Sequence, residues 1–375
     1  MLCFRKMSKV VRIEALTFFR FVAVVIVVIF HFGRDATGFG GVLAAGPQMV
    51  TFFFVLSGFV MALSYLHKDC FNAGSYWWAR ISRIMPVYLL ALGLTLVLSL
   101  IYIRDREVRL TSLILNLTLL QSWFSPHPLS INPPGWALSV EAFFYFTFPF
   151  ILSAIKKYNL SPTKMAAFSL LLWVVTQAIL SGALSNGFYS GFPSFSHDLI
   201  YYFPLSHFCS FLLGISGGMW FIAGKYRVKN IYLSIALVGG AALLLIFFLN
   251  NESQLVKYLG FQVAFCSSFY GPLFLIFIIS ISMCQSKLTS LLSAKPLVLL
   301  GETSYSLYIL QEPAWRIYVH YIANYFNLPP LLNFYAFFVF LVLISILSFL
   351  CFEKPANKFM RVSLPKLVKK KQQTI

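Results

Sequence analysis

Long apolar stretches recur along this chain and constrain its fold more than any other feature. A transmembrane α-helix needs about 20 mainly apolar residues. Ten segments meet that requirement: residues 13–32, 46–66, 85–103, 136–155, 165–184, 201–222, 232–249, 259–283, 298–321 and 333–352. Only 11% of the 375 residues are charged, whereas soluble domains have about 25%. The sequence therefore predicts an all-α polytopic membrane protein, a bundle of about ten transmembrane helices. We expect the shorter apolar run at 111–124 to be re-entrant or interfacial.

The distribution of Lys and Arg predicts the orientation of the bundle. With ten spans, 22 of these cations fall on the side of the two termini and five on the opposite side. Because cytoplasmic loops carry the excess of positive charge, both termini should be cytoplasmic. The net charge of +18 is therefore expected to lie near anionic lipid rather than nucleic acid. This expectation includes Lys369–Lys371 in the basic tail, residues 356–375.

Two polar side chains lie in the first predicted span, eleven positions apart. Arg20 and His31 fall on nearly the same helical face, roughly 16 Å apart along the axis. An intramembrane guanidinium is costly and usually functional. Glu141, in the outer part of the fourth span, is expected to meet His31 at a similar depth. A carboxylate there would fix the tautomer of a general base. The alternative is that His31 is only an interfacial residue at a helix end.

Two arginines precede the third span on the predicted cytoplasmic side. Arg80 and Arg83 are three positions apart and share a helical face, and Pro86 suits the first turn of the following helix. Two guanidinium groups at a membrane surface can clamp a phosphate. The alternative is that both are ordinary positive-inside anchors.

The ninth span, residues 298–321, contains an ion pair at helical spacing and a polar stripe. Glu312 and Arg316 are four positions apart, so we expect them to neutralise each other. Tyr305, Tyr308 and Gln311 could line a polar path, although packing would explain the tyrosines equally well. The histidines show no metal-ligand spacing, so no metal site is expected. His197 and Asp198, in an outer loop, are further candidates for contact with an acceptor.

Six segments, in this order, resemble the acyltransferase-3 family of membrane O-acyltransferases. They extend over nearly the whole chain: Arg20-x10-His31, Phe53-Phe-Val-Leu-Ser-Gly-Phe59, Arg80-x-x-Arg83-x-x-Pro86, Gly135-Trp-Ala-Leu-Ser-Val-Glu-Ala-Phe-Phe-Tyr145, Ser304-Tyr-Ser-Leu-Tyr308 and Phe352-Glu-Lys-Pro355. The resemblance defines residues 1–355 as the acyltransferase-like transmembrane domain.

The resemblance implies a reaction and two substrates. The family moves an acyl group, usually acetyl, from cytoplasmic coenzyme A to a hydroxyl of a surface glycan or lipid-linked saccharide. The expected partners are therefore acyl-coenzyme A, a cell-envelope polysaccharide such as lipopolysaccharide O-antigen, and membrane lipid, with no permanently bound cofactor. The expected location is a bacterial inner membrane.

The resemblance also implies roles for individual residues. His31 would deprotonate the acceptor or carry the acyl group, Glu141 would orient His31 or the acceptor, and Arg20 would steady the donor. Arg80 and Arg83 would hold the phosphates of the coenzyme. The substrate or the donor would also contact three residues of the ninth span, Ser304, Tyr305 and Tyr308.

This chain departs from the family in two places, and two other functions remain open. Gln311 stands where many members have histidine. The hydrolase-like domain that some members carry after the last span is not expected here, so transfer would be completed alone or with a separate partner. One alternative keeps the machinery but uses another acyl group, such as succinyl, or a small-molecule acceptor. The other is a secondary transporter, although the matching broken spans of many transporters are not evident.

Overall fold

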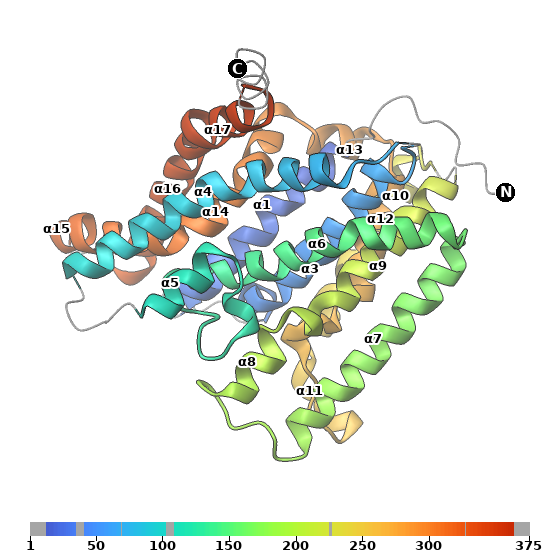
Figure 1. Cartoon of the computed structure of the whole chain (residues 1–375), viewed down its shortest axis with the longest axis horizontal. Coiled ribbons are helices and arrows are strands. Elements are labelled where there is room, and N and C mark those ends of the chain that lie inside the picture. The colour runs from blue at the N-terminus through green and yellow to red at the C-terminus, as the bar shows by residue number, and fades with distance from the viewer. Residues whose placement is uncertain are drawn as a thin grey trace, which may run out of the picture.

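A computed structural model describes six stretches of the chain: residues 13–34, 41–68, 70–102, 109–224, 227–326 and 328–363. These stretches are helical, and they contain eight helices long and apolar enough to cross a membrane. The prediction of an all-α polytopic membrane protein is therefore confirmed. Figure 1 shows the long helices crossing one another in a single bundle.

The helices have the following bounds: α1 Glu14–Val28, η1 Ile29–Gly33, η2 Gly41–Ala44, α3 Gly46–Tyr65, α4 Ala73–Tyr102, α5 Leu110–Leu117, η3 Gln121–Trp123, α6 Gly135–Lys157, α7 Pro162–Ser185, α8 Phe195–Tyr201, α9 Pro204–Ala223, α10 Ile231–Asn250, α11 Glu252–Leu259, η4 Phe265–Phe269, α12 Gly271–Met283, α13 Lys287–Leu292, α14 Lys295–Tyr318, η5 Val319–Ala323, α15 Asn324–Phe326, α16 Pro330–Ser348, η6 Phe349–Glu353, α17 Lys354–Lys358 and η7 Phe359–Ser363.

The predicted span at 259–283 is not one continuous helix. The backbone leaves the helical region at Ser267 and Ser268, and the apolar helix α12 begins only at Gly271. Side chains of α7 occupy the break: Gln177 Nε2 donates to the Ser267 carbonyl at 2.7 Å, and Trp173 Nε1 donates to the Ser268 carbonyl at 2.9 Å. Irregular backbone is tolerated at membrane depth only where protein satisfies its polar groups, and α7 does so here.

The prediction that a new helix begins near Pro86 is wrong. Helix α4 runs from Ala73 to Tyr102 with Pro86 inside it, so Arg80 and Arg83 lie on the same helix as the third span. Proline is tolerated within membrane helices because neighbouring groups satisfy the freed backbone carbonyl. The two guanidinium groups are therefore fixed to a long rigid element rather than to a loop.

Glycines allow two pairs of long helices to cross at very short distance. A Cβ atom on Gly58 of α3 would lie 2.0 Å from the Phe211 carbonyl oxygen of α9, and one on Gly301 of α14 would lie 1.9 Å from the Thr17 carbonyl oxygen of α1. Close backbone approach at small residues is a common way for membrane helices to associate. The second crossing holds α1 against α14 at the depth of the candidate site.

Different helices lie at the two ends of the bundle. The start of α1 and helix α17 line one cavity and so share an end, while α5, α8 and α11 lie toward the other end (Figure 1). The first and last described segments therefore lie at one end, and we call the end with α13 and α17 the cytoplasmic end because the distribution of Lys and Arg predicts that location for the termini. Lys369–Lys371 of the predicted basic tail lie outside the described residues, and helix α17 crosses the predicted boundary at 355.

Candidate active site

Three adjoining cavities lead from the cytoplasmic end toward the centre of the bundle. The entry cavity, about 750 Å³, lies between α1, α3, α4, α14 and the η6–η7 segment. The middle cavity is about 100 Å³ and the inner chamber about 60 Å³. Arg20 lines all three, Arg80 and Arg83 line the first two, and Glu141 and Tyr305 line the last two. The shared residues join the cavities into one path.

The entry cavity is strongly cationic. Besides the three arginines, Lys354, Lys358 and Arg361 line it, whereas Glu302 and Glu353 are the acidic residues in its lining. The structure therefore brings Arg20, Arg80 and Arg83 to one wall, as a phosphate-binding role requires.

Arg80 is held in place by aromatic rings and keeps a free donor. Its guanidinium carbon lies 5.8 Å from the ring centre of Tyr76 and 5.9 Å from that of Tyr145, and Nη2 donates to the Tyr65 hydroxyl at 3.4 Å. Its Nε is buried and, within the part of the chain that the structure describes, has no hydrogen-bond partner. A buried donor without a partner costs free energy, so this group is suited to an anion entering the cavity.

Glu141 lies beside Arg20 rather than beside His31. Its carboxylate attracts both Arg20 and Arg83, and it accepts a hydrogen bond from Tyr145, one turn further along α6. An intramembrane carboxylate needs such partners. Glu141 therefore forms the acidic centre of the arginine cluster.

The ninth predicted span supplies the opposite wall of the inner chamber. Ser304, Tyr305 and Tyr308 all line it, because Ser304 lies one turn after Gly301 and so packs beside Arg20, which lies one turn after Thr17. Ser304 is buried and donates to the Gly301 carbonyl at 2.7 Å. Tyr305 donates to the Ile84 carbonyl of α4 at 2.8 Å, so its hydroxyl ties α14 to α4.

His31 is not part of this cluster, and the expectation that it meets Glu141 is wrong. His31 lies on the π-helical turn η1, and its side chain is exposed at the protein surface. It lines none of the three cavities, and apart from α1 the main neighbours of η1 are α16, α3 and η2. Its neighbouring rings are Phe30 and Phe32, at 5.1 and 6.0 Å.

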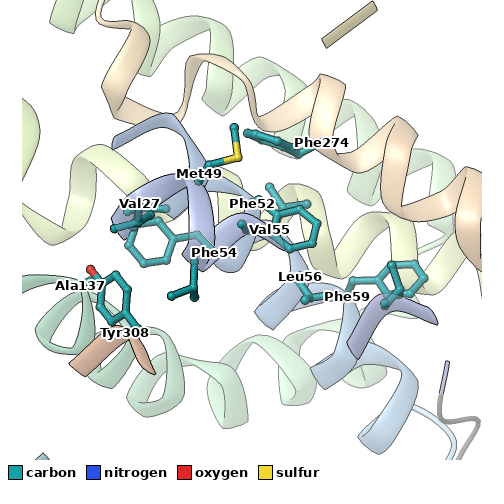
Figure 2. Packing of buried hydrophobic residues seen from close by; sticks show 14 of the residues in the cluster. Val27, Met49, Phe52, Phe54, Val55, Leu56, Phe59, Ala137, Phe274 and Tyr308 are labelled. Carbon is teal, nitrogen blue, oxygen red and sulfur yellow. The ribbon is translucent and has the colours of Figure 1, made fainter. Parts of the chain in front are cut away.

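An apolar layer separates His31 from the inner chamber. Val27, one turn before His31, is buried in the same cluster as Met49 and Phe54 (Figure 2). Seven residues separate Val24, in the chamber lining, from His31, which corresponds to about 10 Å of helical rise. The site therefore has two parts, the arginine–carboxylate cluster and His31.

Glu353 is a site residue that the sequence interpretation missed. It is 6% exposed, accepts a hydrogen bond from Ser306 at 2.6 Å, and attracts Arg20 and Arg83. The last predicted span ended at 352, so this carboxylate was not considered among the intramembrane charges. The signal that could have found it is a lone acid directly after a long apolar stretch, inside the Phe352–Pro355 motif.

Replacing Glu353 with alanine is expected to destabilise the protein by about 1.5–3 kcal/mol, the range for a hydrogen bond to a charged group. Glu353→Gln keeps an acceptor for Ser306 and should cost clearly less. Thermal unfolding of the purified protein in detergent measures both. An equal loss in the two variants would mean that the charge of Glu353, rather than its hydrogen bond, stabilises this region.

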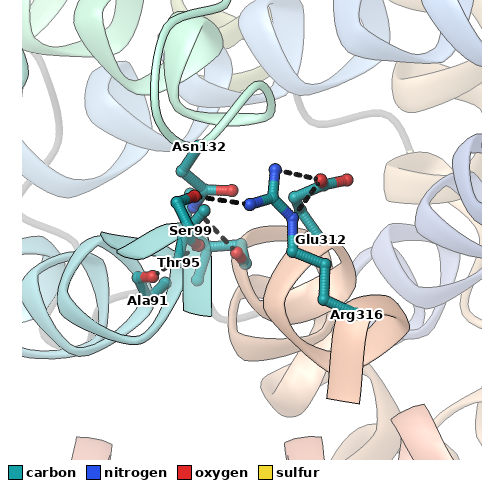
Figure 3. A network of polar contacts seen from close by, with 7 residues as sticks. Ala91, Thr95, Ser99, Asn132, Glu312 and Arg316 are labelled. Carbon is teal, nitrogen blue, oxygen red and sulfur yellow. Dashed lines mark hydrogen bonds and ion pairs between the residues drawn. The ribbon is translucent and has the colours of Figure 1, made fainter. Parts of the chain in front are cut away.

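The predicted ion pair of the ninth span is confirmed. Arg316 Nη2 lies 2.7 Å from Glu312 Oε1, and Arg316 Nη1 donates to Ser99 Oγ of α4 at 2.7 Å (Figure 3). Nearby, Asn132 donates to the Ile309 carbonyl at 3.1 Å. None of these residues lines the three cavities, so this network connects helices.

Other candidate polar residues lie apart from the cavities. Gln311 is buried and donates to the Tyr308 carbonyl at 2.9 Å, and its Oε1 has no partner among the described residues. His197 Nδ1 lies 3.0 Å from the Tyr189 hydroxyl, and Asp198 accepts from Ser125 at 2.6 Å. No group of three side chains able to hold a metal ion occurs in the stretches that the structure describes.

The comparisons with known proteins identify the family of this chain. A model of the acyltransferase-3 family, described as an acyltransferase domain, matches residues 13–352. The acyltransferase MdmB of Streptomyces mycarofaciens is 28% identical over 80% of this chain and 79% of its own length. The O-acetyltransferase OatA of Staphylococcus aureus strain MRSA252 is 24% identical over 94% of this chain, which spans 58% of that relative. No solved structure matches the chain.

The helical bundle and the match over nearly its whole length define a multi-pass membrane O-acyltransferase. The chain belongs to the acyltransferase-3 family, and the resemblance predicted from its motifs is confirmed. Membership of this family also favours acyl transfer over the transporter alternative.

Proposed function

We propose that this protein transfers an acetyl group from cytoplasmic acetyl-coenzyme A to a hydroxyl of a cell-envelope polysaccharide or lipid-linked saccharide, in a bacterial inner membrane. The observation that carries the proposal is the cation-lined path from the cytoplasmic end to Arg20 and Glu141. The name of the relative OatA, an O-acetyltransferase, supports acetyl as the group transferred.

The entry cavity suits the donor. Coenzyme A is a polyanion because of its phosphates, and its pantetheine arm is long and largely uncharged. Arg80 and Arg83, together with Lys358 and Arg361 at the same cavity, would hold the phosphates. The arm would then extend through the middle cavity and bring the thioester to Arg20 and Glu141. Binding charged groups near the entrance and the neutral arm further inside agrees with the cost of moving charge into a membrane.

The reaction exchanges one acyl bond for another. The acceptor oxygen bonds to the acyl carbon, the carbon–sulfur bond of the thioester breaks, and the hydroxyl proton is passed by a base to the departing thiolate, giving free coenzyme A thiol. His31 is the proposed base on the acceptor side, or a transient carrier of the acyl group. Arg20 steadies the donor, and Glu141 keeps the Arg20 guanidinium oriented.

The separation between the arginine–carboxylate cluster and His31 suggests a different role for each. The donor reaches the arginine cluster from the cytoplasmic end, whereas His31 lies at the opposite end of the first helix, where an outer acceptor would approach. Transfer requires the thioester and the acceptor to meet, so the apolar layer around Val27 must open, or the acyl group must be relayed through it. Ping-pong kinetics would indicate the relay.

The experiment that tests the proposal uses membranes containing the protein, radiolabelled acetyl-coenzyme A and the host's own envelope glycans. Label is expected in base-labile ester on glycan together with release of free thiol, and only when the intact protein is present. If label appears on glycan with succinyl-coenzyme A but not with acetyl-coenzyme A, acetyl is refuted as the transferred group. Thiol release without labelled glycan would refute the glycan acceptor.

Replacing Arg80 and Arg83 together with alanine is expected to raise the apparent KM for acetyl-coenzyme A by about tenfold or more. The double substitution removes two charge-assisted contacts to phosphate, each worth roughly 1.5–3 kcal/mol at most. Initial rates at varied donor and fixed acceptor measure the change, and the KM for acceptor should stay constant. If both arginines are only positive-inside anchors, the donor KM will stay the same and the amount of protein in the membrane will fall.

A further inference from the structure

The inner chamber at the end of the path is small and lined mainly by buried residues. Its volume is about 60 Å³. On the same scale a cavity of about 150 Å³ holds one benzene molecule, so this chamber holds roughly two to three non-hydrogen atoms. An acetyl group has two carbons and one oxygen, whereas butyryl and succinyl each have four carbons, and the last carbon of succinyl is a carboxylate.

The chamber is reached through a narrow neck. Arg20, Phe53, Glu141 and Tyr305 line both the middle cavity and the chamber, so they form the boundary between them. These four side chains are half-buried. An arm entering from the cytoplasmic end would therefore pass the guanidinium and carboxylate before its terminal group reaches the chamber.

Beyond the neck the wall is mainly apolar and rigidly packed. Val24, Val50, Ala137 and Leu138 are 1–6% exposed and come from three different helices, α1, α3 and α6. Closely packed interiors do not expand readily to admit extra methylene groups. The carboxylate of a succinyl group would also be placed against this apolar wall at a desolvation cost.

We infer that this chamber limits the length of the acyl group to two carbons, and that the side chains of Leu138 and Val50 set this limit. The inference rests on the proposed function, because it assumes that the acyl end of coenzyme A enters by this path. Leu138 and Val50 are specificity-determining residues under this inference, and the neck residues take part in donor binding.

Two kinds of substitution change the chamber in opposite directions. Leu138→Ala and Val50→Ala remove side-chain volume from its wall, and either can be used if the other fails to accumulate in the membrane. Ala137→Leu adds three carbons to the wall, about the size of an acetyl group. Leu171→Ala on α7 is the matched control, because Leu171 is 63% exposed and lines none of the three cavities.

The test compares acetyl-, propionyl- and butyryl-coenzyme A as donors in membranes with equal amounts of each variant. One misplaced methylene in a hydrophobic pocket changes rates by roughly 10–200-fold. We therefore expect the wild-type protein to prefer acetyl over butyryl by about tenfold or more. Leu138→Ala or Val50→Ala should raise the butyryl-to-acetyl ratio by about tenfold, Ala137→Leu should block acetyl transfer, and Leu171→Ala should change nothing.

Two results would overturn the inference while leaving the proposed function intact. One is equal use of the three donors by the wild-type protein. The other is an unchanged butyryl-to-acetyl ratio in both enlarged variants at normal abundance. Absence of transfer from every donor would instead reject the proposed function, and the inference with it.

Discussion

Replacing Arg20 with methionine is expected to abolish acyl transfer, with a loss of at least about 100-fold. Among the residues that the structure describes, Arg20 alone lines the entry cavity, the middle cavity and the inner chamber. Its removal takes away the cation beside the donor and leaves the Glu141 carboxylate without the arginine that attracts it most strongly. Removing one group that stabilises charge at a reacting centre lowers the rate by roughly 100- to 1,000-fold. Radiolabel transfer from acetyl-coenzyme A measures the loss.

Two further variants separate chemistry from folding in this experiment. Arg20→Lys keeps the charge but loses the planar fork of the guanidinium, so activity should fall by about tenfold while membrane abundance is preserved. Arg109→Met removes an exposed arginine before α5 and should leave the rate unchanged. Activity in the Arg20→Met variant would show that Arg20 is not required for acyl transfer.

Replacing His31 with alanine is expected to reduce transfer by about 100-fold or more, the usual contribution of a general base, and to leave donor binding intact. The structure motivates this separation, because His31 lines none of the cavities that contain the arginines. Binding of radiolabelled coenzyme A and transfer to glycan are measured on the same membranes. Arg20→Met should weaken both, whereas His31→Ala should affect transfer alone.

A histidine at the cytoplasmic end provides the control for this prediction. His67 follows α3 and lines none of the cavities, so His67→Ala should behave like the wild-type protein. Full activity of His31→Ala would support the alternative of an interfacial residue at a helix end. Loss of coenzyme A binding in that variant would instead mean that His31 belongs to the donor site.

The fold could be predicted from the sequence wherever one long apolar stretch forms one helix. Eight of the predicted spans correspond to long apolar helices, and α14 is helical over Lys295–Tyr318 despite its charges. The failures occurred where side chains from another part of the chain decide the backbone. The break at Ser267 and Ser268 depends on donors from α7, and a hydropathy pattern does not contain that information.

The sequence predicted which residues form the arginine–carboxylate cluster, but not how deep in the membrane each of them lies. The scarcity of intramembrane charges was enough to identify Arg20 and Glu141, and the structure brings both to one cluster. Pairing Glu141 with His31 failed because α6 was assumed to start at the outer surface. Its first residue, Gly135, is instead buried, and the preceding segment packs inside the bundle, where Gln121 Nε2 donates to the Gly135 carbonyl at 2.8 Å. Glu141 consequently lies deeper than its sequence position indicated.

The central claim is that the acyl donor enters through the cation-lined cavity at the cytoplasmic end, and donor sidedness in sealed vesicles tests it most directly. Acetyl-coenzyme A does not cross a bilayer because of its charge. In inverted vesicles, which expose the cytoplasmic face, externally added donor should release free thiol, and Arg20→Met vesicles should give the blank value. Right-side-out vesicles should release none until they are permeabilised. Equal rates in intact vesicles of both orientations would contradict the account.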